Sequence, residues 1–399
     1  MDRIVVVGAG QAGAAAAAKL RALGYQGALT LIGAEAAPPY QRPPLSKKYL
    51  TGEIGLDRLL LRPASWYADQ GITLRTGEAV TSIDRDGGAV LLDGARIGYD
   101  ALILATGAAP RRLPAAAGGA LAGVHVLRDL ADADALAPEM VAGRHLLVVG
   151  GGYIGLEAAA VAITRGLRVT LIEAAPRLLA RVACAETAAW FRNLHAARGV
   201  ELLEGCALAR LEGGDRLEVA VLADGRRLTC DLAVVGIGVT PNVALAEAAG
   251  LALDNGIACD ALGQTSDPRI WAAGDCASFP HQGGRLRLES VQNAIDMAEA
   301  VAANILGAAR PYLPQPWFWS DQYEVKLQIA GLGGGATRVV IREAGAGRSH
   351  WYFADDRLIA VDAMNDARAY MVGKRLIEAG RSPSAEAIAD PATELKALL

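Results

Sequence analysis

The sequence has few cysteines and histidines, and neither set is spaced to bind a metal. Its five cysteines form no C-x-x-C pair, and their number is odd: Cys184, Cys206, Cys230, Cys259 and Cys276. We therefore expect reduced, mostly structural thiols of a cytosolic protein. The five histidines are scattered, so neither a zinc site nor an iron–sulfur cluster is expected.

Long apolar runs and blocks of one charge are also missing. No uninterrupted apolar stretch reaches the roughly 18 to 20 residues of a membrane span, and the first residues lack the basic segment of a signal peptide. The formal net charge is −4 over 399 residues, without a polybasic block. We expect a soluble, cytoplasmic protein of two or three domains that binds neither nucleic acid nor membrane.

What the sequence does contain is a nucleotide-binding pattern near its start. The apolar run Ile4–Val7 is typical of a buried parallel strand, and Gly8-Ala9-Gly10-Gln11-Ala12-Gly13 follows as a complete G-x-G-x-x-G. An alanine-rich helical pattern and a second strand then lead to Glu35, 22 residues after Gly13. In this fingerprint the glycines allow a tight turn beside a pyrophosphate, and the acid accepts hydrogen bonds from a ribose diol.

The same pattern recurs about 142 residues later. A predicted strand, Leu146–Val149, precedes Gly150-Gly151-Gly152-Tyr153-Ile154-Gly155, and Glu157 lies on the first turns of the following helix. The next strand ends in Glu173, 18 residues after Gly155. One such motif is weak evidence, but two copies in the same strand–helix context predict two dinucleotide sites.

We predict an α/β fold with two Rossmann-like dinucleotide-binding domains and a small α+β C-terminal domain. The stretch Ile270–Cys276 is predicted to be a strand followed by the start of a helix, with Asp275 as a helix N-cap in one interpretation. Linkers are expected at 110–123 and 311–316. The C-terminal domain is expected to contain strands near 325–329, 338–341, 350–353 and 358–362 and a helix near 368–378.

Longer motifs carry a resemblance to a known family: PYQRPPLSK (39–47), GGGYIGLE (150–157), TSDPRIWAAGDCA (265–277), ESVQNA (289–294) and PWFWSDQY (316–323). The chain resembles the two-dinucleotide-domain flavoprotein reductases, which are glutathione-reductase-like. Among them it is similar to the putidaredoxin-reductase-like NADH-dependent ferredoxin and rubredoxin reductases of bacterial oxygenase systems. The resemblance implies an FAD domain (1–111 and 242–316), an NADH domain (112–241) and a C-terminal domain (317–399).

The resemblance also assigns residues to the two nucleotides. Expected FAD contacts are Gly8, Gly10, Ala12, Gly13, Glu35, Arg42, Lys47, Val80, Ala105, Thr106, Gly107, Arg128, Asp275 and Val291. Expected NADH contacts are Gly150, Gly152, Tyr153, Ile154, Gly155, Glu173, Arg181 and Gly238. Asp275 is expected to bond the ribityl or phosphate oxygens of FAD, Val291 to lie near the flavin ring, and Glu289 to lie near the nicotinamide.

The segment after the first acid bears on the chemistry. In disulfide reductases of the same superfamily a cysteine pair lies there, whereas Pro39–Lys47 has no cysteine. The implied reaction is hydride transfer from NADH to the flavin, followed by single-electron transfer to a [2Fe–2S] ferredoxin. That ferredoxin would serve a monooxygenase or a ring-hydroxylating dioxygenase.

Four residues are expected to act in this reaction: Lys47, Glu157, Glu289 and Trp319. Lys47 would hold a cation near flavin N5 and O4, and the alternative is a solvated surface lysine. Glu157 would pair with Lys47 and orient the nicotinamide, and the alternative is an acid favoured by the helix dipole. Trp319 belongs either to the exposed flavin edge or, as we prefer for Trp317 and Phe318, to a packed aromatic cluster.

Charged residues suggest a cofactor preference and a docking surface. Glu173 would repel the 2′-phosphate of NADPH and so favour NADH, with Arg177 and Arg181 near enough in sequence to moderate the effect. A basic rim for an acidic ferredoxin could include Arg310, Lys326, Arg338 and Arg342, although each is individually expected to be a solvated charge.

Other functions are compatible with two dinucleotide sites. They are reduction of a small oxidant such as a peroxide, quinone or oxidised ascorbate, reduction of a rubredoxin, and a redox-sensing protein of the apoptosis-inducing-factor type. The sequence leaves the oligomeric state, monomer or homodimer, open.

Overall fold

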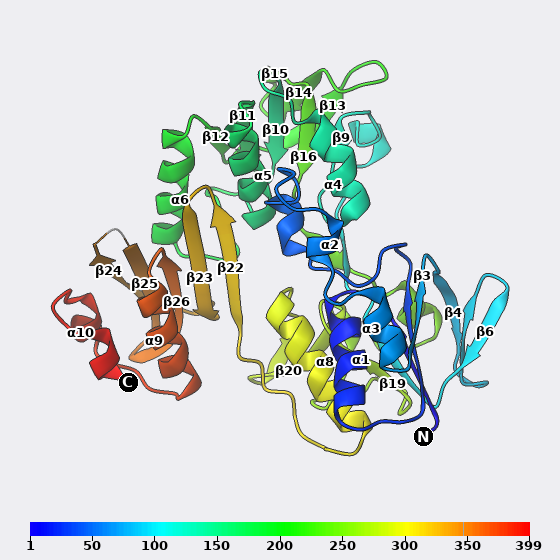
Figure 1. The fold of residues 1–399 in the computed structure, drawn as a ribbon. Coiled ribbons are helices and arrows are strands. Elements are labelled where there is room, and N and C mark those ends of the chain that lie inside the picture. The colour runs from blue at the N-terminus through cyan, green and yellow to red at the C-terminus, as the bar shows by residue number, and fades with distance from the viewer. Residues whose placement is uncertain (346) are drawn as a thin grey trace. The chain divides into compact units, whose positions relative to one another are not determined.

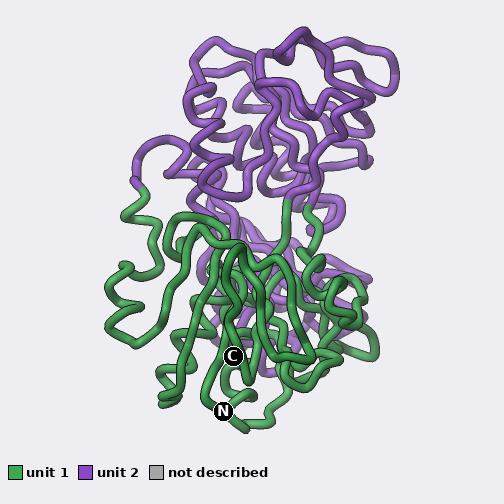
Figure 2. Tube along the Cα trace, turned by 90° about the vertical axis from the view of Figure 1, so that its right-hand side faces the viewer, with its two compact units in different colours: residues 1–42, 56–109, 239–314 green, residues 43–55, 110–238, 315–399 purple. Residues whose placement is uncertain are grey.

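The computed structural model describes residues 1–345 and 347–399 (Figure 1). Figure 2 shows that these residues form two compact units. Unit 1 comprises residues 1–42, 56–109 and 239–314, and unit 2 comprises residues 43–55, 110–238 and 315–399. Each unit is therefore assembled from three separate stretches of the chain.

Unit 1 is built on a five-stranded parallel sheet in the order β19-β7-β1-β2-β3. The strands are β1 (Arg3–Val7), β2 (Ala28–Gly33), β3 (Ile72–Thr76), β7 (Ala101–Leu104) and β19 (Ile270–Ala272). Ile4, Val5 and Val6 are at most 1% exposed, as expected for a strand covered on both faces. Helix α1 (Gln11–Ala22) packs against α8 (Val291–Ile305), and its alanines permit a close approach.

Smaller elements complete unit 1. They are α2 (Leu56–Leu59), α3 (Ala64–Asp69), β4 (Val80–Asp84), β5 (Ala89–Leu92), β6 (Ala95–Gly98), β8 (Ala108–Pro110, which ends at the first residue of unit 2), β17 (Val239–Pro241), α7 (Ala244–Ala248), β18 (Ile257–Ala258), β20 (Ala277–His281) and β21 (Gly284–Leu286). The prediction of a helix directly after Asp275 was wrong, because the chain turns at Gly274 and continues as strand β20. Asp275 is therefore not a helix N-cap.

Unit 2 repeats the parallel arrangement, in the order β12-β11-β10-β16-β9. Its elements include η1 (Pro43–Ser46), η2 (Ala115–Ala117), β9 (Val124–His125), α4 (Leu130–Leu136), η3 (Ala137–Glu139), β10 (His145–Val149), α5 (Tyr153–Thr164), β11 (Arg168–Glu173), α6 (Ala185–Ala197), β12 (Glu201–Glu204), β13 (Leu208–Glu212), β14 (Val219–Leu222), β15 (Arg227–Thr229) and β16 (Leu232–Val235). The stretch expected to be a linker at 110–123 contains η2.

The C-terminal part of unit 2 has its own hydrophobic core. This part contains an antiparallel sheet with the strand order β22-β23-β26-β25-β24. Two helices and a final turn follow the last strand in the chain. These are β22 (Trp317–Gln322), β23 (Val325–Gly331), β24 (Arg338–Ala344), β25 (Gly347–Ala354), β26 (Arg357–Met364), α9 (Ala367–Glu378), α10 (Ala385–Ala389) and η4 (Leu395–Leu398). Trp351, Val361 and Leu376 are fully buried in that core. The predicted C-terminal strands and helix are confirmed.

The predicted fold class is confirmed by these sheets. Each parallel sheet contains a strand that is followed in the chain by a glycine turn and a helix. A separate antiparallel domain comes after both sheets in the chain. Across the described ranges, no helix is both long and apolar enough to cross a lipid bilayer.

Candidate functional site

The first glycine turn joins β1 to α1 and is shaped by close backbone contacts. Gly8 has φ of +110°, and a Cβ atom there would lie 2.1 Å from the carbonyl oxygen of Ala105. A Cβ on Gly13 would lie 1.9 Å from the carbonyl oxygen of Gly8. Gly10 differs, because a Cβ there would meet nothing within 4 Å. The outer glycines thus close the turn, and the middle one leaves open space in which a pyrophosphate fits.

The helices that follow the two glycine turns start without a side-chain cap. Gly10 precedes α1 and Gly152 precedes α5, and neither position supplies a capping hydrogen bond. Among described helices of similar length, α6, α8 and α9 have side-chain acceptors at this position, from Cys184, Ser290 and Asp366. A phosphate group is the natural partner for an uncapped, positively polarised helix start.

Glu35 follows the second strand of unit 1 and is held by two neighbours. Its carboxylate accepts hydrogen bonds from the Tyr40 hydroxyl and from the Arg42 guanidinium. The Arg42 guanidinium also stacks over the Tyr40 ring, 5.2 Å from its centroid. The PYQR segment therefore folds back on the acid and fixes its orientation at the end of β2.

The remaining predicted FAD contacts lie next to or at the ends of strands and helices. Thr106 and Gly107 directly follow β7, and the Thr106 hydroxyl donates to the carbonyl of Asn242 at 2.6 Å. Asp275 follows β19, Val80 begins β4 and Val291 begins α8. Arg128 lies in unit 2, directly before the Asp129 cap of α4. Glu289 pairs with Arg287 at 2.7 Å.

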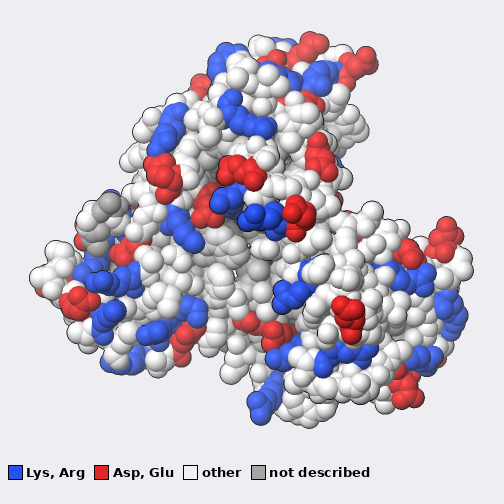
Figure 3. Space-filling model, viewed as in Figure 1, with Lys and Arg blue, Asp and Glu red and all other residues white. Residues whose placement is uncertain are grey.

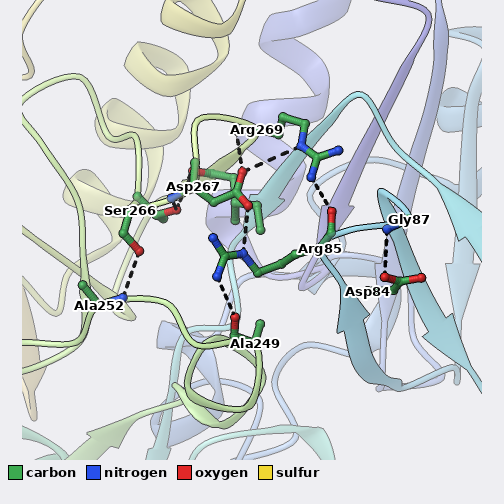
Figure 4. Close-up of polar contacts among 10 residues, drawn as sticks. Asp84, Arg85, Gly87, Ala249, Ala252, Ser266, Asp267 and Arg269 are labelled. Atoms are coloured by element: carbon green, nitrogen blue, oxygen red, sulfur yellow. Dashed lines mark hydrogen bonds and ion pairs between the residues drawn. The ribbon is translucent and has the colours of Figure 1, made fainter.

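Asp267 anchors the loop that leads into β19 (Figure 4). Its carboxylate is buried and accepts hydrogen bonds from Arg85 Nε at 2.8 Å and from the backbone N–H of Arg269 at 2.9 Å. Burial alone would raise the pKa of Asp267, but these hydrogen bonds and the two guanidinium charges outweigh it and hold the pKa below its usual value. The TSDPR motif thus fixes the strand that ends before Asp275.

An Asp267→Asn variant is expected to lose about 1–3 kcal/mol of stability at pH 7, because an amide group would face the Arg85 donor. A lowered carboxylate pKa contributes stability above the unfolded value of about 3.9. The difference between the proteins should therefore shrink as the pH falls through the folded pKa. Thermal melting over a series of pH values from 7 down to the lowest at which the protein folds measures this, with the more exposed Asp84→Asn as a control that changes little.

The second glycine turn repeats the geometry of the first. Gly150 has φ of +107°, and a Cβ there would lie 2.4 Å from the Gly236 carbonyl oxygen. A Cβ on Gly155 would lie 2.1 Å from the Gly150 carbonyl oxygen, and one on Gly152 would meet nothing within 4 Å. Tyr153 begins α5, its ring packs on Phe318 and its hydroxyl is buried, so its contact with NADH stays a prediction.

Glu173 lies against this turn. Its Oε2 accepts the backbone N–H of Gly151 at 2.7 Å, and its Oε1 accepts that of Ala175 at 2.7 Å. The carboxylate is therefore fixed beside the glycines, where the fingerprint places the acid that binds a ribose. Arg177 instead donates to backbone carbonyls of its own loop, including that of Ala183 at 2.8 Å.

Arg181 lies next to Gly238. Its guanidinium lies 3.5 Å from the point where a Cβ on Gly238 would stand. Arg181 is exposed. The structure thus brings together two of the residues predicted to bind NADH.

Lys47 and Glu157 form an ion pair inside unit 2. Lys47 Nζ lies 2.7 Å from Glu157 Oε2, and the Glu157 side chain is only 2% exposed. The hydroxyls of Ser46 and Ser320 also donate to this carboxylate. The predicted pairing is therefore present, and the neighbouring hydroxyls satisfy a buried charge that would otherwise be costly.

Comparison with known proteins identifies the family. A family model described as pyridine nucleotide-disulphide oxidoreductase matches residues 2–298, and a model described as reductase C-terminal matches residues 317–399. The chain belongs to the pyridine nucleotide-disulphide oxidoreductase family.

Members of this family resemble the chain along its whole length. Rhodocoxin reductase of Rhodococcus erythropolis is 43% identical over 400 residues, covering 98% of this chain and 93% of the relative. A ferredoxin–NAD(P)+ reductase of a Sphingomonas species is 44% identical, covering 94% and 92%. The crystal structure of a covalent putidaredoxin reductase–putidaredoxin complex matches with a TM-score of 0.96 at 40% identity, covering 100% of this chain and 98% of that chain. The predicted resemblance is confirmed.

This member of the pyridine nucleotide-disulphide oxidoreductase family has no thiol suited to disulfide exchange among its described cysteines. All five are free, and four are buried. Burial raises the pKa of Cys230 to about 11 and that of Cys259 to about 12, so neither forms a thiolate near neutral pH. Together with the cysteine-free segment Pro39–Lys47, these values argue against a redox-active disulfide formed by Cys230 or Cys259.

The tryptophan motif forms an aromatic cluster on β22. The Trp317 and Trp319 rings are 5.6 Å apart, and Phe318 packs on Tyr153 at 4.8 Å. Trp317 also packs against the C-terminal core. Packing is confirmed for Trp317 and Phe318, whereas the role of Trp319 stays a prediction.

The predicted basic rim needs one correction. Arg342 is only 5% exposed and donates to the carbonyls of Ile388, Asp390, Pro391 and Thr393. It therefore holds the C-terminal loop and is neither a rim residue nor a solvated charge. Figure 3 shows basic and acidic residues interspersed on the face in view.

The sequence interpretation missed the polar residues behind Glu157. Ser46, Ser320, Gln322 and His195 are buried and linked by hydrogen bonds. A signal for two of them was available: Ser320 and Gln322 alternate along a strand and so share one face. Nothing in the sequence placed His195 beside them.

Proposed function

We propose that this protein is an NADH-dependent FAD reductase that supplies electrons, one at a time, to a [2Fe–2S] ferredoxin in the cytoplasm. That ferredoxin serves a monooxygenase or a ring-hydroxylating dioxygenase. The observation that carries the proposal is the pair of matching glycine turns, one in each unit, each with an uncapped helix and a fixed acid. Bound FAD supplies the step from two-electron to one-electron chemistry.

Residue roles follow from this proposal. We assign FAD to residues 1–111 and 242–316, NADH to 112–241, and the remaining domain to 317–399. Glu35 holds the FAD ribose, and Glu173 holds the ribose of NADH. Lys47 supplies a cation for reduced flavin, fixed by Glu157, and Trp319 and Glu289 are assigned roles in the same reaction.

The test is electron transfer with a defined panel of acceptors. Gently purified protein should be yellow and should reduce at least one [2Fe–2S] ferredoxin with NADH, followed by absorbance under anaerobic conditions. A colourless protein without flavin contradicts the proposal. Rapid turnover with a quinone or peroxide, and none with ferredoxins or rubredoxins, would assign a small-molecule reductase instead.

A Glu173→Gln variant is expected to use NADPH about 10- to 100-fold better relative to NADH, because the charge that repels the 2′-phosphate is removed. Glutamine keeps one oxygen for the Gly151 N–H, and the Ala175 N–H loses its acceptor, but this change acts equally on the measurements with both nucleotides. The measurement is kcat/KM for both nucleotides. Glu201→Gln, on the neighbouring strand β12, is the control and should leave the ratio unchanged. A wild-type preference for NADPH would contradict the role of Glu173.

A further inference from the structure

A line of buried polar side chains extends from Glu157 to the turn between β22 and β23. The Ser320 hydroxyl donates to Glu157 Oε1 at 2.6 Å, and Gln322 Nε2 donates to Ser320 Oγ at 3.1 Å. Gln322 Oε1 lies 2.8 Å from His195 Nε2, and the Tyr323 hydroxyl lies 3.2 Å from His195 Nδ1. Ser320, Gln322 and His195 are fully buried.

The donor and acceptor chemistry of these groups makes all the hydrogen bonds in the line point in one direction. The amide oxygen of Gln322 can only accept, so His195 carries its proton on Nε2. In a neutral ring Nδ1 is then an acceptor for the Tyr323 hydroxyl. Burial lowers the pKa of His195, which keeps the ring neutral. Each group therefore donates toward the Glu157 carboxylate.

The far end of the line is built with a strained residue. Tyr323 has φ of +54°, a left-handed conformation that is unfavourable for a bulky side chain. Its ring packs on His195, with centroids 5.1 Å apart, and the Arg198 guanidinium lies 4.9 Å from the ring centroid. Glycine would adopt this conformation without strain. We therefore attribute the presence of tyrosine at this position to the contacts that its side chain makes.

We propose that His195, Gln322 and Ser320 are positioning residues that hold the Glu157 carboxylate against Lys47. The consequence for flavin chemistry rests on the proposed function, but the arrangement itself does not. The line is not a proton conductor, because the Gln322 amide would have to change tautomer to pass a proton on. It acts by orienting donors around a buried charge.

The first test uses the native flavoprotein. Nitrogen NMR of 15N-labelled histidines, with His195 assigned from a His195→Gln spectrum, should show a neutral ring protonated on Nε2. Any titration of the signal should occur below the ordinary histidine pKa of about 6.5. A ring protonated on Nδ1, or one that titrates with a pKa near 6.5, overturns the proposal even if every variant folds poorly.

The second test measures the reactivity of Lys47 by trace acetylation and mass spectrometry. An amine held against a carboxylate reacts slowly, and the exposed neighbour Lys48 serves as an internal reference. In Gln322→Leu, the Gln322 amide no longer donates to the Ser320 hydroxyl, so Ser320 and the Glu157 carboxylate are held less firmly. Lys47 labelling relative to Lys48 should then rise about threefold or more.

A matched control separates positioning from general damage. Thr187 lies on α6, as His195 does, and donates to the buried carboxylate of Asp362 at 2.6 Å in a different polar cluster. Thr187→Val should perturb packing between α6 and the C-terminal strands without changing the labelling ratio. Equal ratios in Gln322→Leu and Thr187→Val overturn the proposal. Neither readout needs ferredoxin, so a failure of the proposed function stays distinguishable.

Discussion

A Lys47→Met variant is expected to reduce its bound flavin with NADH about 100-fold more slowly than the wild type. Lys47 is the cation paired with Glu157 at 2.7 Å, and methionine keeps the length of the side chain without its charge. An isolated buried carboxylate would remain, so the variant should also lose about 3 kcal/mol of stability. Stopped-flow absorbance measures the rate, and thermal melting measures the stability.

The double variant Lys47→Met/Glu157→Gln separates these two effects. Removing the orphaned charge should restore most of the stability, whereas the slow flavin reduction should remain. Lys48→Met changes an exposed neighbouring lysine and should leave both quantities unchanged. Flavin reduction at the wild-type rate in folded Lys47→Met would remove Lys47 from the reaction.

The second large effect is expected at the NADH turn, where two glycines two positions apart should respond differently. Gly152→Ala should fold normally, because φ is −80° and a Cβ meets no atom within 4 Å. Its methyl group occupies the open space proposed for the pyrophosphate, so KM for NADH should rise about 10- to 100-fold. Flavin content should match that of the wild type.

Gly150→Ala should instead fail as a folded protein. Its positive φ and a Cβ only 2.4 Å from the Gly236 carbonyl oxygen force the backbone apart. Soluble yield, flavin content and NADH kinetics of the two variants give the comparison. An unchanged KM in Gly152→Ala would mean that NADH binds elsewhere.

The parts of the site that were predictable are those encoded by consecutive residues. The glycine spacing at Gly8 and Gly150, with Glu35 and Glu173 at the following strand ends, predicts both turns. The backbone contacts with Ala105 and Gly236 that shape these turns are not visible in that spacing. The pairing of Lys47 with Glu157 was also accessible, because both belong to longer motifs that the family resemblance placed together.

Other features depend on contacts that the local sequence does not record. His195 meets Gln322 across 127 positions of the chain, on a helix whose burial depends on the C-terminal strands. The local sequence around Arg342 is typical of a surface charge. In the fold, the C-terminal loop covers this side chain and binds it through carbonyl groups. The strand after Asp275 was missed because a glycine turn can precede either a helix or a strand.

The two uncapped helices make the proposed nucleotides part of the folding of the chain. A ligand that supplies the missing partner for a helix start binds the folded state alone and raises its stability with its own concentration. A retained FAD would do this permanently for α1, whereas NADH, released in each cycle, would do so for α5 only intermittently. The start of α5 is therefore expected to loosen and tighten once per turnover, in step with the redox cycle.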